Sequence, residues 1–334
     1  MHNVITARIK IMANLNVAER RVPQDGRVEL EVDFRKIDVR IATLPTLHGE
    51  KIVIRILDLG HGLSSVSSLG FSEPNERRFL QQIEASSGVV LITGPTGSGK
   101  STTLYSALSH LNRDDVNIIT VEDPVEYQLD GVNQVQVHHA AGMTFSRGLR
   151  AILRQDPNVI MIGEIRDAET AEIAVRAAIT GHLVLSTLHT NSAAGAVTRL
   201  ADMGVEPFLI SSSVRCVVAQ RLVRKICPHC KTEYEPLPAE IKRLSDHGLY
   251  TNRLFHGAGC GDCGRTGYKG RIAIHEVLEV DDAMRAMVLA KRSDHDYFAH
   301  ALKQGMIPLM ADGLRKAAEG QTTLAEVYRV LGKE

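Results

Sequence analysis

The sequence has no tryptophan, and aromatic residues make up only 4% of its 334 residues. Bases of single-stranded nucleic acids stack on aromatic side chains, so this scarcity argues against a nucleic-acid groove. An excess of charge of one sign is also missing, because 39 Lys and Arg balance 39 Asp and Glu. No overall basic field therefore favours nucleic acid, although a neutral total is compatible with a local basic stripe.

Long apolar runs are absent as well. No run approaches the roughly 18 residues that suggest a membrane span, and residues 1–8 lack the apolar core of a signal peptide. These absences predict a cytoplasmic protein. In that compartment the five cysteines are better explained as metal ligands or buried thiols than as disulfides.

A glycine-rich loop is the most informative segment that is present. Residues 94–101 match the pattern G-x-x-x-x-G-K-S/T, with the apolar run 89–93 before them and a helical segment, 102–108, after them. This order predicts a phosphate loop, because backbone N–H groups and a helix N-terminus converge on a polyphosphate. Lys100 would reach the β- and γ-phosphates, and the Ser101 hydroxyl would bind Mg²⁺. The expected nucleotide-binding residues are Gly94, Pro95, Thr96, Gly97, Ser98, Gly99, Lys100, Ser101 and Thr102.

The hydrophobic pattern changes along the chain and predicts several domains. Residues 1–16 have helical spacing, and apolar residues alternate at period two between residues 27 and 57, which indicates short antiparallel strands. Apolar strands then alternate with helices, which predicts an α/β fold with a largely parallel sheet. These strands are expected near residues 89–93, 118–121, 132–137, 159–162 and 183–188.

Five domain assignments follow from this pattern. They are an N-terminal α+β domain (1–60), a Gly/Ser-rich linker (61–70), an α/β nucleotide-binding domain (71–225), a tetracysteine subdomain (226–270) and a C-terminal helical region (271–334).

Acidic residues follow two of the predicted strands. Strand 118–121 leads into Glu122, Asp123 and Glu126, and strand 159–162 is followed by Glu164 in the Walker B position. A nucleotide enzyme needs carboxylates at such strand ends to associate with Mg²⁺ and to orient water. A solvated strand end is the alternative for any single acid. Two acid-tipped strands so close to a phosphate loop make that alternative improbable.

Histidines and arginines lie near these motifs. His182 and His189 flank the strand 183–188, where a structural role and γ-phosphate sensing are both open interpretations. Phosphoryl transfer also requires arginines. The candidates near the motifs or on the N-terminal strands are Arg150, Arg154, Arg166, Arg40 and Arg55. The last two belong to a different domain, so a role for them requires domain closure or a neighbouring subunit.

The cysteines form two C-x-x-C pairs, Cys227 with Cys230 and Cys260 with Cys263. Each pair can point two thiolates at one ion, and two pairs complete a tetrahedral zinc site with no open position, which predicts structural zinc. A redox C-x-x-C is the competing interpretation, and His229 is a possible substitute ligand. Cys216 is expected to be a buried residue on a helix.

Together these motifs resemble the secretion ATPases of type II secretion and type IV pilus assembly over nearly the whole chain. The tetracysteine element is similar to that of the pilus-assembly and type II secretion branch. The segments that carry the resemblance are 16–27, the phosphate loop, 121–127 (Asp box), 154–157 with 163–167 (Walker B), 181–191 (His box) and the cysteine pairs. The resemblance implies a RecA-like P-loop ATPase domain and a PAS-like N-terminal domain. Family members carry further strands and a docking domain before this point, so the resemblance implies either that the chain is a fragment or that its N-terminal sheet is incomplete.

The resemblance also implies residue roles. Glu126 would be the water-activating base and Glu164 the acid associated with Mg²⁺. Phosphate contacts would come from the arginines, and conformational sensing from the histidines of the His box. The residues concerned are Arg40, Arg55, Arg150 and Arg166, with His182 and His189.

The assembly implied by the resemblance is a homo-hexameric motor that uses ATP and Mg²⁺ and contains Zn²⁺. It would power protein secretion or pilus assembly from the cytoplasmic side of the inner membrane. Its expected partners are inner-membrane platform and cytoplasmic-anchor proteins, with membrane contact only through them and no nucleic acid. The motifs are those that bind and hydrolyse ATP and not those that contact the cargo, so they do not distinguish a secretion ATPase from a pilus-assembly ATPase.

Two rival hypotheses remain at the level of sequence. A RecA-like nucleic-acid translocase shares the scaffold, and neutral charge and few aromatics count against it. A non-catalytic binding module regulated by nucleotide and zinc is the other, and the intact acidic strand ends argue against it.

Overall fold

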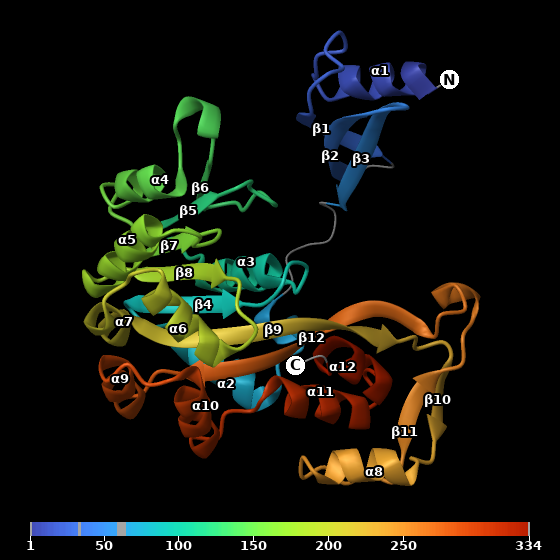
Figure 1. The fold of residues 1–334 in the computed structure, drawn as a ribbon, viewed down its shortest axis with the longest axis vertical. Helices are drawn as coiled ribbons and strands as arrows, with labels where there is room; N and C mark the ends of the chain where they lie inside the picture. Colours follow the sequence, from blue (N-terminus) through green and yellow to red (C-terminus); the bar gives the residue numbers. More distant parts are fainter. Residues whose placement is uncertain (1, 33–34, 59–64, 333–334) are drawn as a thin grey trace. The chain divides into compact units, whose positions relative to one another are not determined.

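The computed structural model describes residues 2–32, 35–58 and 65–332, and the chain divides into two compact units, residues 1–63 and 64–334. Each unit is described by itself (Figure 1). Part of the predicted linker 61–70 lies outside the described residues, and Val66–Leu69 forms a short 3₁₀ helix, η1. The domain boundaries assigned within residues 64–334 remain predictions.

The small unit contains a helix and an antiparallel sheet. Helix α1 (His2–Met12) ends four residues earlier than expected. Strands β1 (Gln24–Val32), β2 (Arg35–Thr46) and β3 (Gly49–Asp58) pair in that order, which confirms the predicted antiparallel strands. The period-two pattern places Val39 and Ile41 in a small core.

The large unit is built on a seven-stranded sheet with the order β12-β9-β4-β8-β7-β5-β6. All neighbouring strands from β9 to β6 are parallel, and only β12 runs antiparallel, to β9. The predicted α/β fold with a largely parallel sheet is therefore confirmed. The strands are β4 (Gly88–Thr93), β5 (Ile118–Glu122), β6 (Asn133–Gln136), β7 (Val159–Ile162), β8 (Leu183–Leu188), β9 (Val214–Ile226) and β12 (Tyr268–Glu279).

Helices cover both faces of this sheet, because its central strands are apolar on both sides. In β4, Val89 and Leu91 pack into one core and Val90 and Ile92 into the other. The core that contains Val90 also includes residues of α2 (Glu73–Ile83) and α3 (Lys100–Leu111). The opposite core includes residues from the remaining main helices of this unit. These are α4 (Phe145–Ile152), α5 (Ala168–Ile179), α6 (Ala193–Asp202), α7 (Pro207–Ser213), α9 (Asp282–Leu289), α10 (Asp294–Lys303), α11 (Leu309–Ala318) and α12 (Leu324–Leu331).

The tetracysteine segment forms an excursion between β9 and β12. It contains a two-stranded antiparallel sheet, β10 (Lys231–Tyr234) and β11 (Leu254–Gly257), with α8 (Pro238–Ser245) between its strands. Figure 1 shows this segment extending away from the ends of β9 and β12. Because β10 and β11 pair, the chain folds back after α8 and returns toward the first cysteine pair.

The long strands β9 and β12 were not predicted. Strand β12 crosses the boundary assigned at residue 270, so the C-terminal region 271–334 begins with a strand before its helices. Cys216 lies in β9, so its assignment to a helix was wrong, although it is fully buried as expected. Among the described residues, no helix has the length and apolar character that crossing a bilayer requires.

Candidate functional site

The phosphate loop lies between β4 and α3, at the carboxyl edge of the parallel strands. Gly94, Gly97 and Gly99 have φ angles of 151°, 80° and 89°. A side chain at Gly94 would approach the Gln220 carbonyl oxygen to 2.5 Å, and one at Gly99 would approach the Gln220 amide nitrogen to 2.8 Å. The loop therefore requires glycine at these positions, and α3 presents its positive end to whatever the loop holds.

Lys100, the first residue of α3, is folded against this loop. Its ammonium donates to the carbonyls of Gly94 (2.8 Å) and Pro95 (3.2 Å). Burial lowers the pKa of Lys100, whereas the neighbouring Glu164 carboxylate raises it and Arg221 lowers it. Glu164 thus lies within electrostatic reach of the ammonium, and a bound anion would compete for the same hydrogen bonds.

Glu164 is the centre of a second group of charged side chains. It follows β7, and its side chain is 14% exposed. The Arg166 Nε atom lies 2.6 Å from Glu164 Oε2, and His189 Nε2 lies 3.6 Å from the same oxygen. The structure therefore brings two residues of the Walker B segment and one of the His box to one place near Lys100.

Glu126 lies in the loop that follows β5, at the same edge of the sheet, and is half-buried. Its backbone N–H donates to the Tyr105 hydroxyl of α3 at 3.1 Å. The two predicted acids, Glu126 and Glu164, thus share the edge of the sheet that carries the phosphate loop.

His182 and Arg150 have other surroundings. His182 precedes β8, and its carbonyl accepts the Gly88 N–H at 3.1 Å, which places it at the amino edge of the sheet. A six-residue strand spans about 20 Å, so this edge is remote from the loop. The His182 Nδ1 atom is 2.9 Å from the Ala177 carbonyl, which favours the structural interpretation. Arg150 on α4 pairs with Glu169 at 2.5 Å.

Three arginines form a row across the sheet of the small unit. Arg40 and Arg55 are directly opposite each other on β2 and β3, and Arg27 on β1 is opposite Arg40. Opposite residues share one face of a sheet. The fully buried Asp38 carboxylate lies 2.8 Å from Arg27 Nε and 3.8 Å from Arg40 Nε. Arg27 and Asp38 were not predicted, because cross-strand register decides this arrangement.

Gln220 of β9 is a second residue that the sequence did not reveal. Its side chain is 2% exposed, donates to the Ser98 carbonyl (2.8 Å) and accepts from the Thr103 hydroxyl (2.7 Å). One amide thus holds both the phosphate loop and the first turn of α3. The available signal is a glutamine that interrupts an apolar strand.

Replacing Gln220 with alanine is expected to weaken nucleotide binding by about tenfold. The change removes the donor to the buried Ser98 carbonyl and leaves the Thr103 hydroxyl with only its longer contact to the Gly99 carbonyl (3.4 Å). An unsatisfied buried group costs about 1–3 kcal/mol, and 1.4 kcal/mol corresponds to a factor of ten in affinity. Titration with a fluorescent ATP analogue measures the effect. Gln304→Ala, at an exposed glutamine, is the matched control, and equal affinities for both variants would contradict the role assigned to Gln220.

A small cavity of about 210 Å³ adjoins the end of the phosphate loop and the first turn of α3. Gly99 and Thr102 line it together with the apolar side chains of Leu69, Leu222 and Ile272. It combines the end of the phosphate loop with apolar side chains and with the basic residues Lys225 and Arg271. This composition suits a flat aromatic group attached to the phosphates.

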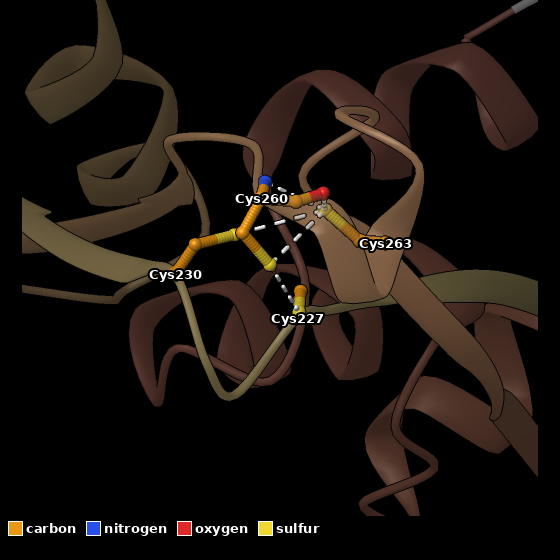
Figure 2. A group of neighbouring side chains, drawn as sticks. All are labelled: Cys227, Cys230, Cys260 and Cys263. Carbon is orange, nitrogen blue, oxygen red and sulfur yellow. Dashed lines mark hydrogen bonds between the residues drawn. The ribbon is translucent and has the colours of Figure 1, made fainter.

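The four cysteines of the two pairs gather at one point, as Figure 2 shows. Their sulfur atoms all lie within 4.8 Å of one another. The S–S distance is 3.8 Å between Cys227 and Cys260, 3.9 Å between Cys230 and Cys263, and 3.7 Å between Cys260 and Cys263. A tetrahedral zinc ion with Zn–S bonds of about 2.3 Å requires sulfurs about 3.8 Å apart. A disulfide requires about 2 Å. The donor set therefore fits Zn²⁺ in a closed site of four protein ligands.

Backbone N–H groups point at the same sulfurs. Cys260 donates to Cys263 Sγ at 3.1 Å, and Gly267 donates to it at 3.3 Å. These N–H groups, that of Cys260 most, lower the pKa of the Cys263 thiol to about 6, whereas burial raises the pKa of Cys230 to about 12. The cluster thus favours the thiolate that a metal requires at Cys263. His229 is instead 3.5 Å from Asp262 and does not belong to the cluster.

Comparisons with known proteins place these features in context. A family described as "Type II/IV secretion system protein" matches residues 1–329. Type II secretion system protein E of Pseudomonas aeruginosa is 51% identical over 331 residues, which are 99% of this chain and 66% of that protein. The type IV pilus assembly ATPase PilB of Thermus thermophilus is 51% identical over 327 residues, 97% of this chain and 37% of PilB. The chain thus spans just under two thirds of the former and about a third of the latter.

A solved structure is also similar. The pilus retraction motor PilT with bound ADP superposes with a TM-score of 0.67 at 27% identity, covering 91% of this chain and 77% of that chain. Together with the mostly parallel seven-stranded sheet, this likeness confirms the predicted RecA-like fold.

Proposed function

The chain belongs to the Type II/IV secretion system protein family, and from this premise we propose that it is part of a Mg²⁺-dependent, hexameric ATPase motor. The motor would power type II protein secretion or type IV pilus assembly at the bacterial inner membrane. The observation that carries the proposal is the convergence of Lys100, Glu164 and His189 at the edge of the sheet that holds the phosphate loop.

ATP would bind with its phosphates on the loop and on the N-terminus of α3. The adenine ring would occupy the cavity lined by Leu69, Leu222 and Ile272. The ADP in the related motor PilT supports a nucleotide as the ligand. The phosphates would draw the Lys100 ammonium away from the loop carbonyls that it contacts.

Mg²⁺ would be held by the Ser101 hydroxyl and associated with the Glu164 carboxylate. Both are oxygen donors at the same edge of the sheet, and Ser101 is exposed there, so the residues present fit the ion. When bound, Mg²⁺ offsets the charge of the phosphate oxygens. Glu126 would hold the attacking water and accept its proton.

The arginines of the small unit would complete the charge compensation. Arg40 and Arg55 lie in a different compact unit from the loop. They would reach the γ-phosphate through domain closure or from a neighbouring subunit, which is the reason to propose a ring. Arg166, beside Glu164, would contact the phosphates from within the same unit.

The proposed partners and location are those of a secretion or pilus-assembly machine. Inner-membrane platform and cytoplasmic-anchor proteins would hold the motor at the cytoplasmic face of the membrane. The names of the relatives include type II secretion and pilus assembly, so both kinds of machine are proposed. These names give no support to the nucleic-acid translocase.

Substitution of the two acids tests the mechanism. Glu164→Ala is expected to abolish turnover, and Glu126→Ala to keep ATP bound but unhydrolysed, because the base is lost while the loop is intact. Nucleotide retained on the purified protein and phosphate release measure the two effects. Glu172→Ala, at an exposed acid that pairs with Arg176, is the control.

Near-normal hydrolysis by the Glu126 variant would remove that residue from the role of base. The motor function has its own test. In a coupled assay, ATP hydrolysis should rise when the cytoplasmic part of a secretion or pilus platform protein is added, and stimulation by single-stranded DNA instead would contradict the proposal.

A further inference from the structure

The carboxylate of Glu122, the last residue of β5, is buried in the large unit. The residue is 3% exposed. A buried carboxylate is costly unless hydrogen-bond donors surround it. Glu122 accepts from the Tyr105 hydroxyl, from the Thr120 hydroxyl at 2.6 Å and from the Gln134 amide at 3.1 Å. Among the described residues, the side chains that donate to this carboxylate are all neutral, and none of them belongs to the phosphate loop.

Tyr105 connects this carboxylate to the loop that carries Glu126. Its ring is 1% exposed and lies on α3, one turn after Lys100 and Ser101. The hydroxyl donates to Glu122 and accepts the backbone N–H groups of Glu126 (3.1 Å) and Tyr127 (3.4 Å). One donor and two acceptor positions are all that a hydroxyl offers, so its hydrogen-bonding capacity is used completely.

The direction of these hydrogen bonds is fixed by the carboxylate. Burial, reinforced by the adjacent Glu122, raises the pKa of Tyr105, so the phenol stays protonated. Its single proton points at Glu122, and its lone pairs are left for the loop. Gln134 of β6 braces the same loop, since its amide donates to the Tyr127 carbonyl at 2.9 Å and accepts the Leu129 N–H at 2.8 Å.

We infer that Tyr105, oriented by Glu122, is a positioning residue that fixes the backbone of Glu126 relative to the helix that binds the phosphates. The inference rests on the proposed role of Glu126 as the base. Tyr105 does not touch the nucleotide in this scheme. It sets the distance between the phosphate loop, from which α3 starts, and the loop from which the base projects.

The chain supplies a matched control for the hydroxyl. Tyr127 packs edge-on against Tyr105, with ring centroids 5.6 Å apart and an interplanar angle of 84°. Among the described residues, no hydrogen bond of the Tyr127 hydroxyl is found. Tyr127→Phe therefore removes a hydroxyl from the same aromatic pair without releasing the Glu126 backbone.

Tyr105→Phe is expected to lower kcat by about 10- to 100-fold, because a catalytic group misplaced by about 1 Å can cost that much. The Kd for ATP should change by less than about twofold, since the phosphate loop keeps its contacts. Tyr127→Phe should leave both quantities unchanged. Phosphate release under saturating ATP and titration with a fluorescent ATP analogue give the two numbers for the full chain.

The double variant Tyr105→Phe/Glu126→Ala separates the inference from the proposed function. If Tyr105 acts through Glu126, the double variant should hydrolyse ATP as slowly as Glu126→Ala alone. A further loss in the double variant, or a normal rate in Tyr105→Phe beside an inactive Glu126→Ala, would overturn the inference. Near-normal hydrolysis by Glu126→Ala would instead overturn the assignment of the base.

If the role of Tyr105 is purely structural, Tyr105→Phe should lower the melting temperature and the ATP affinity together with kcat. This outcome would also overturn the inference. If Tyr105→Phe fails to fold, Gln134→Met carries the same test, because it removes the brace at a half-buried position of an edge strand. A selective fall in kcat supports the inference, and an unchanged kcat contradicts it.

Discussion

Replacing Lys100 with alanine is expected to lower ATP turnover by at least about 100-fold, because removing one group that stabilises transition-state charge costs about 10²–10³ in rate. Only 9% of the lysine is exposed, and its ammonium is already directed at the turn of the loop by two carbonyls. The Glu164 carboxylate supports the charged form against the effect of burial. The lysine therefore meets the phosphates with little rearrangement.

The measurement is steady-state phosphate release with purified protein, together with ATP affinity. Lys242→Ala is the control, because Lys242 is an exposed lysine on α8. Turnover within about threefold of the unchanged chain in the Lys100 variant, with Lys242→Ala also normal, would contradict the assignment of residues 94–101 as the phosphate loop of an ATPase.

Loss of the metal from the tetracysteine cluster is expected to unfold the excursion between β9 and β12. Its sheet has two strands of four residues each, and such a hairpin is marginally stable without further support. Structural zinc contributes binding free energies of about 10–16 kcal/mol in small domains. Cys263→Ser should therefore lose zinc and expose the segment to trypsin at Lys231, Arg253 and Lys269.

Metal analysis and limited proteolysis followed by mass spectrometry check this expectation. The unchanged chain should contain one zinc per chain, and Cys216→Ala should keep it, because Cys216 is buried in β9 outside the cluster. Well below one zinc per chain in freshly reduced protein would reject a zinc site. Intact zinc in the Cys263 variant would remove that residue from the ligand set.

Features with a local signature could be predicted from the sequence. The phosphate loop is encoded in eight consecutive residues, and the strands that lead to Glu122 and Glu164 are short apolar runs followed by acids. Parallel strands place their carboxyl ends at one edge, so the shared position of Glu126 and Glu164 followed from chain order. The metal-ligand cluster of the two cysteine pairs could likewise be predicted from their C-x-x-C spacing.

Features that depend on long-range pairing could not be predicted. Strand β9 contains Gln220, Arg221 and Arg224, which obscure the strand pattern, and its partner β12 lies beyond a 41-residue excursion (residues 227–267). Gln220 reaches the phosphate loop across 122 residues of sequence. His182 shows a limit of motif matching. The His box places it beside strand β8, but the motif does not tell whether it lies at the carboxyl edge of the sheet, with the phosphate loop, or at the amino edge, where it is found.

The row of Arg27, Arg40 and Arg55 has a consequence for the small unit itself. Like charges on adjacent strands repel one another, and the carboxylates of Asp38 and Glu29 oppose this repulsion. An anion that binds the folded row stabilises it by mass action, and multivalent anions would do so more strongly than chloride. We therefore expect the stability of these three strands to rise with the concentration of multivalent anions, and a polyphosphate bound to the row would hold the strands together.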